Sequence, residues 1–132
     1  MANILCVGKD DALMQTRRVI LERAGHVITQ ACDLRQVVAA CEADSFQIAV
    51  LGQSLPAAEK LRIASTVLRH CRSIKVLELH TGIAPDVSTA DAHVRVTASE
   101  PEALGDAVAA LLQRKRDSRE TRAARTARSG GQ

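Results

Sequence analysis

Short apolar runs alternate with helical patterns along most of this chain. Ile4–Val7 is an unbroken apolar run, which is typical of a strand buried on both faces. Further strands are predicted at residues 26–31, 47–51, 74–79 and 94–96. Strands that alternate with helical segments predict a parallel sheet with helices on both faces. The sequence therefore predicts an α/β fold built on a five-stranded parallel sheet.

Helix starts and stops mark the segments between the predicted strands. Asp10 or Asp11 can cap a first helix, which Gly25 ends, and Asp33 opens a second helix in a capping-box-like pattern. The apolar stripe of the first helix is interrupted by one charged residue; its positions are Leu13, Arg17, Ile20, Leu21 and Ala24.

The later helical segments are less alike. In the helix predicted over 57–71, we expect Leu61, Ala64, Leu68 and Cys71 to face inward. Residues 82–90 contain Pro85 and lack an apolar stripe, so only one or two helical turns, or a loop, are expected there. Ser99–Glu102 reads as a capping box for a last helix, whose stripe is Leu104, Val108, Leu111 and Leu112.

The 132 residues suit one domain over 1–113, followed by a basic tail over 114–132 that is predicted to be disordered. From Gln113 to Gln132 there are seven basic and two acidic residues, or +5, against +3 for the whole chain. No apolar run approaches the roughly 18–20 residues that cross a bilayer, and the start lacks the basic region of a signal peptide. None of the four cysteines lies in a Cys-x-x-Cys pair. A cytoplasmic protein with reduced, buried thiols and no membrane partner is expected.

Functional groups of a parallel sheet gather at the carboxyl ends of its strands. These ends carry Gly8, Lys9, Gly52, His80 and Thr97. They supply no nucleophile–base set, no paired acid and base carboxylates and no glycine-rich phosphate loop. A lone histidine without spaced ligands is a poor metal site. We therefore expect no enzymatic activity, no metal and no cofactor.

Several local patterns, in order along Asn3–Gln113, resemble the receiver domains of two-component response regulators. These patterns are the first strand with Asp10, the helix exit Leu21–His26, the Leu55–Pro56 step after the third strand, and the helix start Glu100–Leu104. The resemblance implies a flavodoxin-like sheet with strand order 2-1-3-4-5. It also implies a shortened fourth helix, because only 14 positions separate His80 from Val94.

The positions that carry the chemistry of the family differ in this chain. The resemblance places Gly52 at the phosphate-accepting aspartate, and Gly8 and Lys9 at the acidic residues that hold Mg²⁺. It places His80 at the small hydroxyl residue and Thr97 at the lysine that pairs with the acyl phosphate. A glycine cannot form an acyl phosphate, and a lysine repels a cation.

Two alternatives remain at the first strand end. Asp10 and Asp11 either form a displaced Mg²⁺ site or cap the following helix and complement its dipole. The second interpretation is favoured. Lys9 either pairs with Asp10 or is solvated.

The resemblance predicts a pseudo-receiver that acts by protein–protein contact, without phosphorylation, in bacterial two-component signal transduction. Its partner would be another protein, such as a kinase or an output protein, or a second copy of the chain in a homodimer. The alternative is a protein that binds nucleic acid or another polyanion through its tail. The tail residues concerned are Arg114, Lys115, Arg116, Arg119, Arg122, Arg125 and Arg128.

Overall fold

A computed structural model describes residues 2–71, 73–96 and 102–113 of the chain. Its centre is a five-stranded sheet in the order β2-β1-β3-β4-β5, and every pairing is parallel. The strands are β1 (Asn3–Val7), β2 (Val27–Ala31), β3 (Ile48–Leu51), β4 (Lys75–His80) and β5 (Ala92–Arg95). The predicted sheet and its strand order are confirmed, and the strand bounds shift by one or two residues.

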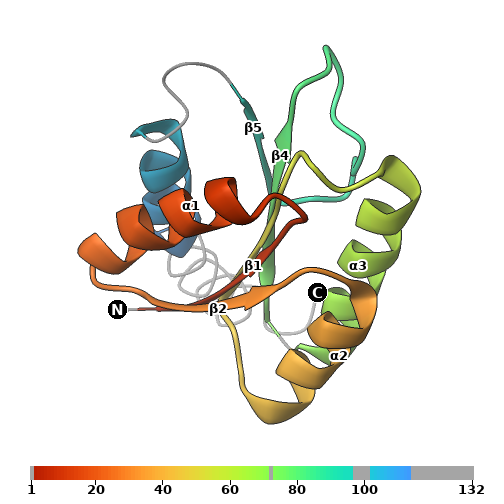
Figure 1. Cartoon of the computed structure of the whole chain (residues 1–132), viewed down its shortest axis with the longest axis horizontal. Coiled ribbons are helices and arrows are strands. Elements are labelled where there is room, and N and C mark those ends of the chain that lie inside the picture. The colour runs from red at the N-terminus through yellow and green to blue at the C-terminus, as the bar shows by residue number, and fades with distance from the viewer. Residues whose placement is uncertain (1, 72, 97–101, 114–132) are drawn as a thin grey trace, which may run out of the picture.

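Helices cover both faces of this sheet (Figure 1). The labelled helices are α1 (Asp11–Arg23), α2 (Leu34–Ala43) and α3 (Ala57–His70), and a further helix spans 102–113. Helix α1 and the 102–113 helix lie on one face, whereas α2 and α3 lie on the other (Figure 1).

Strand β1 shows how the sheet separates two cores. Leu5 and Val7 pack in the cluster shared with α2 and α3, whereas Ile4 and Cys6 pack with α1 and the 102–113 helix. Successive side chains of a strand point to opposite faces, so a strand buried on both faces must be apolar throughout. Each such buried aliphatic side chain contributes about 1.5–3 kcal/mol to folding.

The predicted helix starts at Asp10 and Asp33 are confirmed. Asp10 accepts a hydrogen bond from the Leu13 backbone N–H at 3.1 Å, and Asp33 accepts one from Gln36 at 2.9 Å. The Gln36 side chain in turn accepts from the Cys32 N–H at 2.8 Å. The bonds to Asp10 and Asp33 satisfy N–H groups that the first helical turn leaves unpaired, and the bond to Cys32 ties the preceding residue to α2.

The prediction for the inward face of α3 is wrong in part. Ala64 and Cys71 are buried as expected, but Leu61 and Leu68 are each 48% exposed. The buried face instead carries Lys60, Ile63, Ala64 and Val67. The buried face of α3 therefore differs from the predicted one. Lys60 contacts a buried carboxylate in β4, described below, and Ile63 and Val67 pack in the core.

The segment between β4 and β5 is a loop, which confirms that the fourth helix is irregular. Val87 in this loop is fully buried in the α2–α3 core. In the last helix, Leu104, Val108 and Leu111 are buried as predicted, whereas the capping box Ser99–Glu102 lies mostly outside the described residues. No helix within the described part of the chain has the length and apolar character needed to span a membrane.

Candidate functional site at the carboxyl edge of the sheet

Three of the residues predicted for the site meet where β1 and β3 end. The Gly52 backbone N–H donates to the Val7 carbonyl oxygen at 2.8 Å. The Gly8 backbone N–H donates to the Ala31 carbonyl oxygen at 3.1 Å. The Lys9 N–H donates to the Ser54 hydroxyl at 2.8 Å. Parallel pairing of β1 with both β2 and β3 therefore brings Gly8, Lys9 and Gly52 to one edge of the sheet.

A buried arginine of α1 occupies the space in front of Gly52. Arg17 is 2% exposed, and its guanidinium Nη2 donates to the Gln53 side-chain oxygen. A Cβ built on Gly52 would lie 3.1 Å from Arg17 Nη1. The guanidinium thus lies in tight contact with the point where a side chain at position 52 would begin.

The helical repeat of the sequence places Arg17 on the apolar stripe of its helix but predicts no role for it in the site. The available signal was the charge itself, because a lone arginine within an inward stripe requires an acceptor inside the fold.

Neighbouring atoms pack tightly around both glycines, from backbone at Gly52 and from the Met14 side chain at Gly8. A Cβ on Gly52 would lie 3.1 Å from the Val7 carbonyl oxygen, and a Cβ on Gly8 would lie 2.9 Å from the Met14 sulfur. Glycine permits this close approach because it has no side chain. Any larger residue at position 52 must shift both the Val7 carbonyl and the Arg17 guanidinium slightly.

Lys9 pairs with Glu59 and not with Asp10, so the expectation of an Asp10 pair is wrong, whereas its side chain is 41% exposed to solvent. Its amine donates to the Cys32 carbonyl at 2.9 Å and pairs with Glu59 at 3.0 Å. The hydrogen bond to Glu59 raises the pKa of the Lys9 amine. The lysine side chain thus connects the end of β2 with the start of α3.

These residues do not fit a divalent cation. Gly8 offers no side-chain oxygen, Lys9 and Arg17 are cations, and the Asp10 carboxylate caps α1. Across the residues that the structure describes, no three His, Cys, Asp or Glu side chains come together as a metal site.

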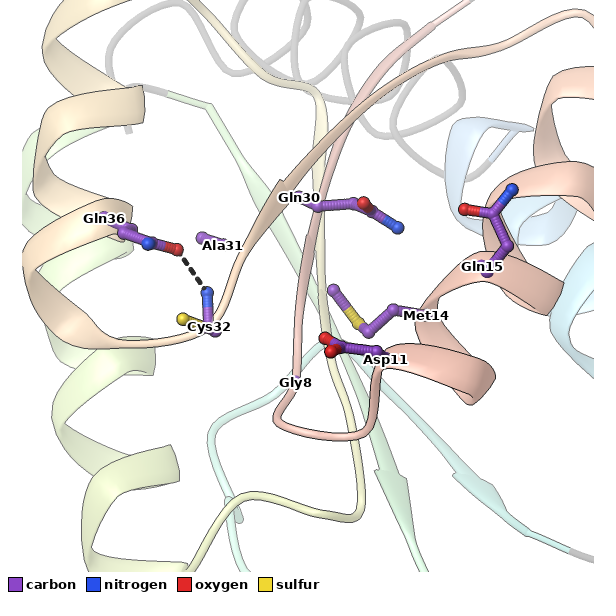
Figure 2. Close-up of a pocket in the computed structure, with 8 residues that line it drawn as sticks. All are labelled: Gly8, Asp11, Met14, Gln15, Gln30, Ala31, Cys32 and Gln36. Carbon is purple, nitrogen blue, oxygen red and sulfur yellow. Dashed lines mark hydrogen bonds between the residues drawn. The ribbon is translucent and has the colours of Figure 1, made fainter.

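A cavity of about 320 Å³ opens beside Gly8, between the start of α1, the end of β2 and the start of α2 (Figure 2). Its polar side chains are mainly neutral amides, and none is a cation. The lining residues are Gly8, Asp11, Met14, Gln15, Gln30, Ala31, Cys32 and Gln36. The single carboxylate, that of Asp11, would repel an anion. The cavity is therefore not suited to bind a phosphate group in place of the receiver pocket.

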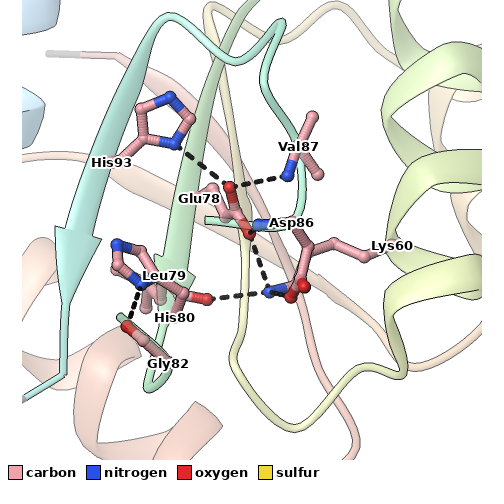
Figure 3. Close-up of polar contacts among 8 residues, drawn as sticks. All are labelled: Lys60, Glu78, Leu79, His80, Gly82, Asp86, Val87 and His93. Atoms are coloured by element: carbon pink, nitrogen blue, oxygen red, sulfur yellow. Dashed lines mark hydrogen bonds and ion pairs between the residues drawn. The ribbon is translucent and has the colours of Figure 1, made fainter. Parts of the chain in front are cut away.

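His80 ends β4 at the predicted place, but its ring contacts the following loop. Its Nδ1 lies 3.0 Å from the Gly82 carbonyl oxygen, and its ring meets that of His93 edge-on at 6.4 Å (Figure 3). Thr97 and the basic tail lie outside the described residues. The assignments of Thr97 and of the tail arginines stay predictions.

A second polar cluster lies in the interior between α3 and β4 (Figure 3). We call it the Lys60–Glu78 cluster, which consists of Lys60, Glu78, Asp86 and His93. Lys60 Nζ lies 3.0 Å from both Glu78 and Asp86 carboxylate oxygens and donates to the Leu79 carbonyl at 3.1 Å. The side chains of Lys60 and Glu78 are 1% and 0% exposed, so the charges are paired out of contact with water.

Glu78 anchors the loop that replaces the fourth helix. Its carboxylate accepts from the backbone N–H groups of Asp86 at 2.8 Å and Val87 at 3.0 Å, and it lies 3.1 Å from His93 Nδ1. Burial alone raises the pKa of Glu78, but hydrogen bonds from Val87, Asp86 and Lys60 outweigh burial and lower it.

The Lys60–Glu78 cluster is not predicted from the sequence patterns described above. A glutamate within the apolar run Val76–Leu79 was the available signal, because a carboxylate in a buried strand needs a partner.

Solved structures with the same fold are response regulators. A receiver domain protein of Methanospirillum hungatei superposes with a TM-score of 0.76 at 21% identity, covering 89% of this chain and 98% of its own. A chemotaxis response regulator of Vibrio cholerae gives a TM-score of 0.72 at 20% sequence identity, with 84% of this chain and 98% of that regulator covered. A response regulator of Thermotoga maritima, solved in complex with a histidine kinase, superposes with a TM-score of 0.70 at 19% sequence identity. The match covers 85% of this chain and 99% of that regulator.

These likenesses establish the fold as that of CheY-like receiver domains. No protein-family model matches the sequence, and no curated protein matches it either.

Proposed function

We propose that this protein is a pseudo-receiver of two-component signal transduction, which acts through protein contact and does not accept a phosphoryl group. One observation carries this proposal: the buried Arg17 guanidinium lies 3.1 Å from where a Cβ on Gly52 would be, at the end of β3. The pocket has no carboxylate at that position and holds a cation from the chain itself.

The electrostatics of the edge support the same proposal. Phosphoryl transfer to a carboxylate needs a nucleophile, and a metal ion that neutralises the charge which develops on the phosphoryl oxygens. Gly52 supplies no nucleophile, and Lys9 with Arg17 disfavours a divalent cation. Lys9 donates to the Cys32 carbonyl and pairs with Glu59 at this edge, although its side chain is 41% exposed.

The partner is proposed to be a protein of the same signalling class. A response regulator with this fold is found in complex with a histidine kinase, which motivates a kinase or an output protein as the partner here. The sequence has no catalytic set that would give the domain an enzymatic role of its own.

The phosphorylation part is tested with Mg²⁺ and beryllofluoride, followed by backbone amide NMR. Tyrosine and tryptophan are absent, so fluorescence offers no intrinsic probe. The expected result is no saturable shift at Gly8, Lys9 or Gly52. The Thermotoga maritima regulator, solved with Mg²⁺ and beryllofluoride, serves as the positive control. A saturable, Mg²⁺-dependent shift in this protein would refute the proposal.

The partner part is tested by affinity capture from an extract of the source cells. Full-length protein and a variant that ends at Gln113 are compared, and captured proteins are identified by mass spectrometry. Retention of the same two-component protein by both forms supports contact through the domain. Salt-sensitive capture of nucleic acid by the full-length chain alone would instead favour the tail.

A further inference from the structure

Two thiols from different helices meet at the edge of the α2–α3 core. Cys41 lies in the last turns of α2, and Cys71 directly follows α3. The Cys71 thiol donates to Cys41 Sγ, and the two sulfur atoms are 2.8 Å apart. All four cysteines of the chain are free, and Cys6 and Cys32 have no such neighbour among their described contacts.

Packing against the α2–α3 core positions both thiols of this pair. Cys71 is 6% exposed and belongs to the buried core, and its backbone N–H donates to Val67 at 2.8 Å. Cys41 packs against the same core and is only partly buried. A disulfide bond is about 2.05 Å long, so bonding needs only a small movement of the two sulfur atoms.

We propose that Cys41 and Cys71 are a modification site that forms a reversible intramolecular disulfide by exchange with a small dialkyl disulfide. The partly exposed Cys41 sulfur, as thiolate, attacks one reagent sulfur, which breaks the reagent bond and releases one thiol. The Cys71 sulfur then attacks Cys41 Sγ and releases the second thiol. The two cysteine sulfurs are oxidised, one reagent disulfide is reduced to two thiols, and these carry away the two cysteine protons.

The pKa of the Cys41 thiol limits the rate of this exchange. Burial, with the neighbouring Cys71 thiol, raises the pKa of Cys41 to about 12. Little thiolate is therefore present at neutral pH, and the rate of bond formation should rise about tenfold per pH unit below that value. The disulfide would join the ends of α2 and α3 and close a loop of 30 residues.

The test uses the full chain carrying Cys32→Ser, which removes the exposed thiol and leaves the pair intact. The folded protein is incubated anaerobically with oxidised glutathione, quenched in acid and mapped by mass spectrometry. The expected product is lighter by two hydrogens, carries a Cys41–Cys71 link and reverts with dithiothreitol. Closing this loop should raise the melting temperature by about 10 °C.

The matched control is Cys32→Ser combined with Cys41→Ala, which should form no internal link and should show no rise in melting temperature. Circular dichroism checks that this variant folds. If it does not fold, the peptide map of the Cys32→Ser protein still decides the question. Unchanged thiols, glutathione adducts without a link, or a link that forms only in denaturant would each overturn the proposal.

Discussion

Replacing Lys60 with methionine tests the buried Lys60–Glu78 cluster most directly. The substitution keeps much of the side-chain volume but removes the ammonium that lies 3.0 Å from Glu78 and 3.1 Å from the Leu79 carbonyl oxygen. Glu78 would keep its contacts with the Asp86 and Val87 N–H groups and with His93, yet its buried charge would lose the Lys60 ammonium. Removing one partner of a buried pair costs about 3–5 kcal/mol.

The size of this loss follows from burial. Both Lys60 and Glu78 are shielded from water, whereas the Asp86 side chain is 41% exposed and adds little through its pairing. A loss of about 3–5 kcal/mol is a large part of the stability of an ordinary domain. Lys75→Met is the matched control, because Lys75 pairs with Asp91 at 3.9 Å in partial contact with solvent and should cost at most about 1 kcal/mol.

The assay is urea unfolding followed by circular dichroism between pH 7 and pH 4. In the unmodified protein the pKa of Glu78 is lowered from 4.5. The stability it contributes is therefore present above the unfolded pKa and is lost as pH falls through the folded pKa. In the Lys60→Met variant the buried carboxylate can be relieved by protonation, so the deficit relative to the unmodified protein should shrink as pH falls. A deficit no larger than that of the control, or one independent of pH, would refute the reasoning.

Three further predictions concern other parts of the fold. Gly52→Asp should not create a beryllofluoride site, because its carboxylate would pair with Arg17; a saturable Mg²⁺-dependent NMR shift would contradict this. Ile63→Ala should destabilise by about 2–5 kcal/mol in urea unfolding, whereas Leu61→Ala, on the exposed face of α3, should cost under about 1 kcal/mol; equal losses would show that the helix is oriented otherwise. Asp33→Ala should lower stability by about 1 kcal/mol in thermal melts through loss of the cap on α2, and an unchanged melting temperature would argue against that cap.

The parts of the fold that were predicted correctly depend on neighbours in the sequence. The apolar run Ile4–Val7 and the cap residues Asp10 and Asp33 act within one strand or one helical turn. Pro85 likewise indicated the irregular segment between β4 and β5. The absence of a carboxylate at Gly52 was also visible in the sequence, once the resemblance to receivers had placed that residue at the end of the acceptor strand.

The tertiary structure alone decided that Lys60 faces inward and which groups the buried charges of Arg17 and Lys60 contact. The sequence shows Arg17 and Lys60 as charges on amphipathic helices, and their partners Gln53 and Glu78 lie 36 and 18 positions further along the chain. A helical repeat cannot distinguish Leu61 and Leu68 from Ile63 and Val67 as the core face of α3. The choice depends on a carboxylate that the sheet presents to this helix, because a buried charge is stable only when the completed fold brings it a hydrogen-bond partner, which is the Glu78 carboxylate for Lys60 and the Gln53 amide for Arg17.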